Sequence, residues 1–115
     1  AIIDEDGPVI ASPFKCSEDA YALEVCGDSM TASHGSLDSF QEGSIIVIEP
    51  NIEARNKSFV VARIKGSDDV TFKQLVFDGS KKFLRPLNPQ YPIIPIDQPI
   101  EICGVVLGKI QKITT

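Results

Sequence analysis

The sequence predicts a mainly β domain, built as a strongly bent sheet or a small, partly open barrel. Short apolar segments rich in Val and Ile recur at close spacing, separated by residues that favour turns. No stretch keeps the 3.6-residue apolar period of a helix over three turns. With 115 residues, 43% of them hydrophobic, the chain has the size and composition of one globular domain. A bent sheet is the natural way for such closely spaced strands to bury their apolar faces.

The first part of the chain predicts an arm followed by two strands. Residues 1–20 hold two prolines and an acidic cluster without periodicity, and we expect an extended arm with one short strand around Val9–Ile10. Residues 21–27 alternate between a more and a less apolar face and end in glycine, as a strand does. Residues 33–43 predict a polar loop. Residues 44–50, "SIIVIEP", are almost continuously β-branched, which predicts a strand buried on both faces.

The middle of the chain predicts two consecutive β-hairpins. The strand "FVVARIKG", residues 59–66, is followed by the short connection "SDD" at 67–69 and then by "VTFKQLVFDG" at 70–79. The glycine-containing stretch "DGSKK", residues 78–82, predicts a second tight turn that leads into "FLRPLN" at 83–88. These segments should therefore lie side by side as antiparallel neighbours.

The last part of the chain predicts a stiff loop and a closing strand. Residues 88–99 contain four prolines, which predict an irregular loop whose apolar side chains, Tyr91 among them, form an interaction surface or pack on the domain itself. Residues 100–113 predict one strand or a strand pair, and Gly104 and Gly108 within it suggest bulges or a bend. The apolar alternation of this segment fits a dimer interface as well as a core.

Composition excludes several classes of function. The net charge of -5 argues against direct binding to a nucleic-acid backbone, which requires a basic face. Three cysteines without a CxxC pattern, and a single histidine, predict neither a zinc site nor a disulfide framework. No apolar run is long enough to span a membrane. We expect a cytoplasmic domain, in a reducing compartment, without metal or cofactor.

Lys73 is out of place in the strand that contains it. Along residues 70–78 it shares a face with Leu75 and Phe77, where an apolar side chain is expected. One interpretation is that the lysine extends from a sheet edge into water. The other is that it is buried, because burial disfavours the ammonium form, lowers the pKa and makes the neutral amine a general base.

A neutral lysine needs a proton donor, and Ser29 in "CGDSM" is the candidate. A serine hydroxyl becomes a good nucleophile only when a base removes its proton. The only histidine, His34, lies in a loop five residues after the serine, and nothing in the sequence directs it toward Ser29. A Ser-Lys dyad of Ser29 and Lys73 is therefore the better pairing. The piece after Ser29 could form one helical turn.

Several stretches together resemble one protein family. "VCGDSM", "SFQEGSIIVIEP", "VARIKGSDDVTFKQL", "FLRPLNPQYPIIPI" and "GVVLGKI" occur in the order and at the spacing of the C-terminal domain of LexA and phage lambda-type repressors. The resemblance extends from about Tyr21 to Ile110, and "TFKQL" and "LNPQYP" are its most specific parts.

The resemblance implies a fold shared with bacterial signal peptidases and a self-cleaving serine peptidase. It implies Ser29 as nucleophile and Lys73 as general base. In such a mechanism we expect backbone N–H groups near the serine, those of Ser29 and Met30, to stabilise the oxyanion. The domain would dimerise or form higher oligomers, partly through its C-terminal strand, and cut the hinge that joins it to an upstream helix-turn-helix domain. A RecA filament would stimulate this cleavage in the SOS response or prophage induction. Residues 1–20 would then follow the hinge, and residues 21–115 would form the dimerisation and self-cleavage domain.

The sequence departs from the family at the cleavage site. The family cuts an Ala-Gly or Cys-Gly bond in the hinge. This chain has no Ala-Gly, and its two Cys-Gly pairs, at 26–27 and 103–104, lie beside the nucleophile and in the last predicted strand. Two alternatives therefore stay open: a repressor domain that only associates and is inactivated by an antirepressor, and a self-processing polymerase accessory subunit of the UmuD type.

Overall fold

The computed structural model describes residues 2–4, by their backbone alone, and residues 17–32 and 39–110. This part of the chain is all β and contains no helix, so it holds no helix that could cross a membrane. The mainly β fold class is thus confirmed. Its strands are β1 (Ile2–Asp4), β2 (Tyr21–Cys26), β3 (Ile45–Glu49), β4 (Phe59–Ile64), β5 (Val70–Asp78), β6 (Lys81–Arg85), β7 (Ile94–Pro95) and β8 (Ile100–Ile110).

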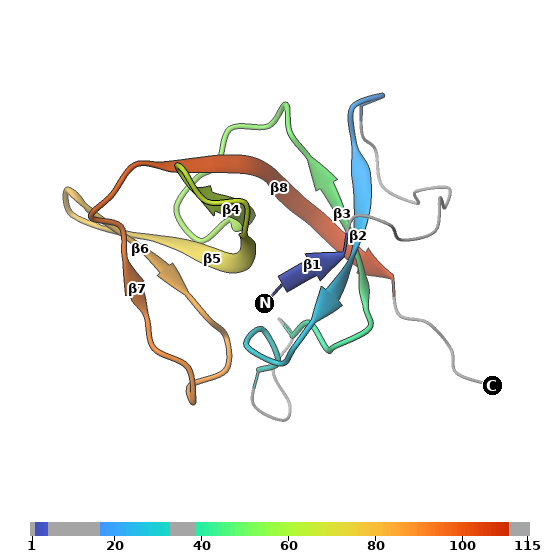
Figure 1. Cartoon of the computed structure of the whole chain (residues 1–115), viewed down its shortest axis with the longest axis horizontal. Helices are drawn as coiled ribbons and strands as arrows, with labels where there is room; N and C mark the ends of the chain where they lie inside the picture. Colours follow the sequence, from blue (N-terminus) through green and yellow to red (C-terminus); the bar gives the residue numbers. More distant parts are fainter. Residues whose placement is uncertain (1, 5–16, 33–38, 111–115) are drawn as a thin grey trace.

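All eight strands join in one antiparallel sheet with the order β1-β2-β3-β8-β4-β5-β6-β7 (Figure 1). The two hairpins expected in the middle of the chain are β4-β5 and β5-β6. β1 and β7 end the order without pairing to each other, yet β1 also contacts β5. The sheet is therefore strongly bent and remains open.

The long strand β8 joins the two halves of this sheet. Its first half pairs with β4 and its second half with β3, and both pairings include Val105. Each pairing has one register shift: Cys103 is the additional residue on β8 opposite β4, and Leu107 is the additional residue opposite β3. These shifts adjoin Gly104 and Gly108, where the sequence predicted bulges. Over its described residues, the closing segment forms one strand and not a strand pair.

Gly104 is required for the close packing of β8 on β3. A Cβ atom built on this residue would lie 2.3 Å from Cγ2 of Ile48 and 3.2 Å from the backbone oxygen of Glu49. Carbon atoms do not approach each other to 2.3 Å without a shift of the backbone or the side chain. The absence of a side chain at Gly104 therefore allows β8 to pass over the end of β3.

Two apolar clusters form the core. All five residues of β3 are buried, as expected for a strand covered on both faces. Phe40 and Phe72 contact edge to face with their ring centroids 4.8 Å apart, and Phe59 lies 4.9 Å from Phe40. The first cluster contains Leu23, Val25, Met30, Phe40, Ile46, Ile48, Val61, Phe72 and Val106, and the second contains Val60, Ala62, Leu75, Leu84 and Val105. The aliphatic core was predicted, whereas the aromatic contacts were not.

A buried carboxylate anchors the chain just before β2. The Glu49 side chain is 4% exposed and accepts hydrogen bonds from the backbone N–H of Ser17 at 2.7 Å and of Asn51 at 3.1 Å. These bonds stabilise the ionised form, the one from Ser17 most strongly, and lower the pKa of Glu49. The strand β2 therefore starts from a point fixed at the end of β3.

Three details differ from the expectations. The proline-rich segment 88–99 contains the two-residue strand β7, which pairs with β6. The residues after Ser29 form a hydrogen-bonded turn from Asp28 to Thr31 and no helix. A strand occurs at Ile2–Asp4, whereas the one expected around Val9–Ile10 lies outside the described residues.

The substitution Gly104→Ala is expected to destabilise the domain. The added methyl group overlaps Ile48, so strand β8 must move away from β3, at a cost of about 1–3 kcal/mol in the free energy of unfolding. Urea denaturation followed by circular dichroism measures this cost. In an Ile48→Ala background the overlapping atom is gone, so the same substitution should cost less. An unchanged denaturation midpoint for Gly104→Ala would contradict this description of the packing.

Candidate active site

Ser29 lies in the turn that follows β2. The strand ends at Cys26. The next residue, Gly27, has a φ of +83°, a backbone conformation that residues other than glycine rarely adopt. After the exposed Asp28, the chain turns inward, so that Ser29 is 4% exposed and Met30 is fully buried in the first apolar cluster. Met30 thus anchors the turn in the core, and Ser29 is held below the surface beside it.

Lys73 reaches this turn from the middle of β5. Its Nζ donates hydrogen bonds to Ser29 Oγ at 3.2 Å and to Thr71 Oγ1 at 2.8 Å, and its third acceptor is the backbone oxygen of Phe72 at 3.1 Å. The side chain is 5% exposed, and β5 lies between β4 and β6. The interpretation in which Lys73 extends from a sheet edge into water is therefore wrong.

Burial shifts Lys73 toward its neutral form. Among the described residues, its hydrogen-bond partners are two hydroxyl groups and one carbonyl, none of which carries a charge. Burial disfavours the ammonium ion, and this desolvation lowers the pKa of Lys73 below the ordinary lysine value. When Lys73 is neutral, its amine has two protons to donate and one lone pair that can accept from the Ser29 hydroxyl at 3.2 Å, which is the geometry required of a general base.

A small, largely apolar cavity lies beside Thr71, a hydrogen-bond partner of Lys73. Its volume is about 100 Å³, and Thr71 is among the residues that line it. Its apolar lining includes Ala62, Leu84 and Ile94. Residues of β4, β5, β6 and β7 therefore surround a space for a small group next to Thr71.

Hydrogen bonds to three successive carbonyl oxygens hold the backbone around Ser29 in place. The oxygen of Asp28 accepts from the N–H of Thr31 at 3.0 Å, that of Ser29 from the N–H of Asn88 at 2.9 Å, and that of Met30 from the N–H of Phe40 at 2.8 Å. These bonds fix the orientation of successive peptide groups. The role of the Ser29 and Met30 amides as oxyanion donors stays a prediction.

The structure adds residues to the site and leaves one candidate out. Thr71 and Asn88 contact the two predicted residues, and sequence reasoning did not single out either of them. The position of Thr71, two residues before Lys73 on the same strand face, was a usable signal. His34 lies outside the described residues, as does Cys16. Within the described segments, Cys26 and Cys103 are free thiols and no cluster of potential metal ligands occurs.

Comparison with known proteins agrees with the resemblance. The Peptidase S24-like family matches residues 2–107. The chain is 52% identical over 92 residues to repressor protein C2 of Salmonella phage P22, a match that covers 80% of this chain and 42% of the repressor. It is 50% identical, with the same coverage, to the HTH-type transcriptional regulator for conjugative element R391 of Providencia rettgeri.

A relative with lower sequence identity is also named as a repressor. The chain is 36% identical over 112 residues to the LexA repressor of Acidovorax sp. (strain JS42), and the match covers 96% of the chain and 46% of that repressor. The chain thus spans less than half the length of each of these three relatives. Since the family match extends over most of the residues and includes both Ser29 and Lys73, the chain belongs to the Peptidase S24-like family.

Proposed function

We propose that this chain is the C-terminal domain of a phage- or SOS-type transcriptional repressor and that it cuts the hinge upstream of itself. The hydrogen bond between Lys73 Nζ and Ser29 Oγ, 3.2 Å long and buried, is the observation that carries the peptidase part of the proposal. Membership of the Peptidase S24-like family supports it, and the relatives named as repressors support the regulatory part.

The reaction begins with a proton transfer from Ser29 to neutral Lys73. The resulting alkoxide attacks the carbonyl carbon of the hinge peptide bond, and the backbone N–H groups of Ser29 and Met30 stabilise the oxyanion. When the tetrahedral intermediate collapses, the C–N bond breaks and the Lys73 ammonium returns its proton to the leaving amine. Water then hydrolyses the ester on Ser29, with Lys73 again acting as the base.

The surroundings of the dyad suit a peptide substrate. Thr71 accepts a hydrogen bond from Lys73 and holds the amine in place, while the apolar cavity that Thr71 lines suits a small apolar side chain of the hinge segment. Ser29 and Lys73 come from a turn and a strand that are 44 residues apart, so the fold must form before the dyad exists. Cleavage would therefore depend on the folded domain.

The remaining functions belong to the longer protein. DNA binding would reside in an upstream helix-turn-helix domain, because a chain with a net charge of -5 is a poor partner for phosphates. Residues 1–20 would form the arm that follows the hinge. A RecA filament, or an antirepressor, would trigger inactivation in the cytoplasm of the bacterial host.

Self-association is the second part of the proposed role. Over residues 106–110, β8 pairs with β3 on one edge, and the pairing of β4 with β8 ends at Val105. Leu107, the additional residue at the bulge, is only half-buried and belongs to neither core cluster. An apolar side chain beside a length of strand edge that no described strand pairs with suits contact with a second copy.

Removing either member of the dyad should abolish cleavage. In the full-length repressor at alkaline pH, Ser29→Ala and Lys73→Met should reduce the first-order cleavage rate by at least about a thousandfold, because nucleophile and base act as a unit. Gel electrophoresis of timed samples measures the rate. Lys81→Met, at an exposed position on β6, is the matched control and should cleave at the wild-type rate. A protein that stays intact at alkaline pH and with a RecA filament would instead favour the domain that only associates.

The cleavage rate should rise with pH. Only neutral Lys73 accepts the serine proton, and burial lowers its pKa, so the midpoint of the profile should fall below the ordinary lysine value of about 10.4. Well below that midpoint the rate should drop about tenfold per pH unit. Rates measured across buffers of constant ionic strength, with circular dichroism to verify folding, give the profile. A rate that is constant or declines with pH would exclude Lys73 as the base.

The isolated domain should self-associate at micromolar concentration. Sedimentation equilibrium over a concentration series is expected to give a mass above that of one chain. Leu107→Glu places a charge beside the edge of β8 that no described strand pairs with and should shift the equilibrium toward the monomer. Lys81→Glu, on the distant β5-β6 hairpin, controls for the change in net charge. A strict monomer at every concentration would overturn this part of the proposal.

A further inference from the structure

Asn88 binds the Ser29 turn through two separate groups. Its backbone N–H donates to the carbonyl oxygen of Ser29 at 2.9 Å. Its side-chain amide, through Nδ2, donates to the carbonyl oxygen of Asp28 at 3.1 Å. One residue, 60 positions further along the chain, therefore holds two consecutive carbonyl groups of the turn.

These two carbonyls belong to the peptide groups whose amides are the candidate oxyanion donors. The carbonyl of Asp28 shares a peptide plane with the N–H of Ser29, and the carbonyl of Ser29 shares one with the N–H of Met30. The described peptide bonds are all trans, and in a trans peptide the C=O and N–H vectors point in opposite directions. Both amides are therefore turned away from Asn88 and held on the opposite side of their planes.

We propose that Asn88 is a positioning residue for the oxyanion hole of this peptidase: it fixes the two peptide groups that present the N–H groups of Ser29 and Met30 to the substrate carbonyl. The inference rests on the proposed self-cleavage and adds a residue that neither touches the substrate nor exchanges a proton. Asn88 acts through the backbone of the turn.

Two physical effects follow from these bonds. First, donors whose orientation is fixed before the reaction stabilise a developing oxyanion without a cost of reorganisation. Second, a carbonyl that accepts a hydrogen bond polarises its peptide group, so the N–H at the other end becomes a stronger donor. Within the turn, the N–H of Thr31 already binds the carbonyl of Asp28; Asn88 adds a second bond to that carbonyl and supplies the bond to the carbonyl of Ser29.

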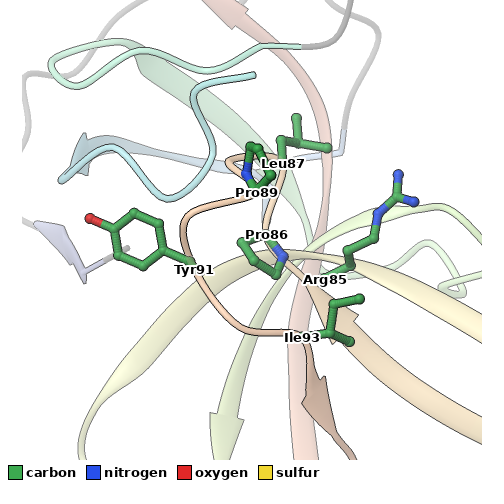
Figure 2. A pocket seen from close by; sticks show the side chains of 6 residues that line it. All are labelled: Arg85, Pro86, Leu87, Pro89, Tyr91 and Ile93. Carbon is green, nitrogen blue, oxygen red and sulfur yellow. The ribbon is translucent and has the colours of Figure 1, made fainter. Parts of the chain in front are cut away.

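Tyr91 secures the same turn from further along the loop. Its hydroxyl donates to the carboxylate of Asp28, and its backbone N–H bonds to the carbonyl of Asn88 at 3.1 Å. Figure 2 shows the Tyr91 ring on the side of the loop opposite to the Arg85 and Ile93 side chains, which line the same cavity. The Tyr91 side chain therefore reaches back toward the turn, although the residue is 42% exposed.

The contact with Asp28 also keeps the Tyr91 hydroxyl protonated. The hydrogen bond and the negative charge of Asp28 raise the pKa of Tyr91, so the phenol keeps its proton further into the alkaline range. The loop itself is stiff, because the side-chain oxygen of Asn88 accepts from the N–H of Gln90 at 3.0 Å and Pro89 restricts the backbone between them. The backbone N–H and the side-chain amide of Asn88 therefore donate from a rigid segment of the loop.

The first test uses Asn88→Asp in the full-length repressor. This variant keeps the oxygen that caps Gln90 and the backbone donor to Ser29, but it loses the amide donor to Asp28. We expect the first-order cleavage rate to fall roughly tenfold to a hundredfold at the plateau of the pH profile, where Lys73 is neutral in both proteins and the charge added by the substitution no longer affects its protonation. In the ¹H–¹⁵N spectrum of the folded variant, the amide resonance of Ser29 should shift more than that of Met30.

The second test separates positioning from folding. Tyr91→Phe removes one hydroxyl from an exposed ring and should reduce the rate roughly three- to tenfold at an unchanged melting temperature. Asp28→Ala removes the acceptor of the same hydrogen bond and should match Tyr91→Phe. The double variant Asp28→Ala/Tyr91→Phe should be no slower than either single variant, since both remove the same bond.

Gln90→Ala, in the same loop, is the matched control and should cleave normally. Rates within twofold of wild type for both Asn88→Asp and Tyr91→Phe would overturn the positioning role while leaving the self-cleavage intact. A rate loss that merely follows the fraction of unfolded protein would overturn it as well. A wild-type protein that does not cleave would overturn both proposals, and this outcome is recognised without any variant.

Discussion

The site depends on one buried interaction, the hydrogen bond between the amine of Lys73 and the hydroxyl of Ser29. Burying a lysine disfavours folding while its amine is protonated, because the ammonium ion loses its hydration and its hydrogen-bond partners among the described residues are neutral. The surrounding structure must therefore be stable enough to hold it. That requirement explains why Lys73 lies on an interior strand, between β4 and β6, with its amine held by three acceptors.

The strand β8 makes this arrangement possible by connecting the two halves of the sheet. Ser29 follows β2, which belongs to the β3 half, and Lys73 belongs to the β4 half. The two halves meet along β8, where a bulge in each pairing and the missing side chain of Gly104 allow the strand to bend over β3. A small error in that crossing would move the serine relative to the lysine, and the two atoms are only 3.2 Å apart.

The turn that holds Ser29 is fixed from two sides. From below, Met30 is buried in the first apolar cluster, which also contains Phe40 and Phe72. From the side, Asn88 binds the carbonyls of Asp28 and Ser29. The local bond from the N–H of Thr31 fixes only the carbonyl of Asp28, so the carbonyl of Ser29 depends on Asn88. The fixed lysine and the fixed turn thus meet in one geometry, which is what proton transfer and oxyanion binding both require.

The sequence by itself predicted most of the strands and the pairing of Ser29 with Lys73. Alternation of apolar residues, glycine-containing turns and the two glycines of the closing segment predicted the hairpins, the buried strand at 44–50 and the bulges. Lys73 was recognisable because a charged side chain interrupts an apolar strand face, and Ser29 followed as the one group that a neutral lysine could activate. These signals are local, since each depends on residues that are neighbours along one strand or turn.

Only the tertiary structure decided which distant residues meet. The distance between Lys73 and Ser29, the aromatic contacts of Phe40 and the two bonds of Asn88 depend on strand order, on register and on the curvature of β8. Apolar alternation states which face of a strand is buried, but it does not state which other strand covers that face. The motif "LNPQYP" marked the segment that contains Asn88, but it did not state which groups this residue contacts, because its partners are backbone carbonyls, which every sequence contains.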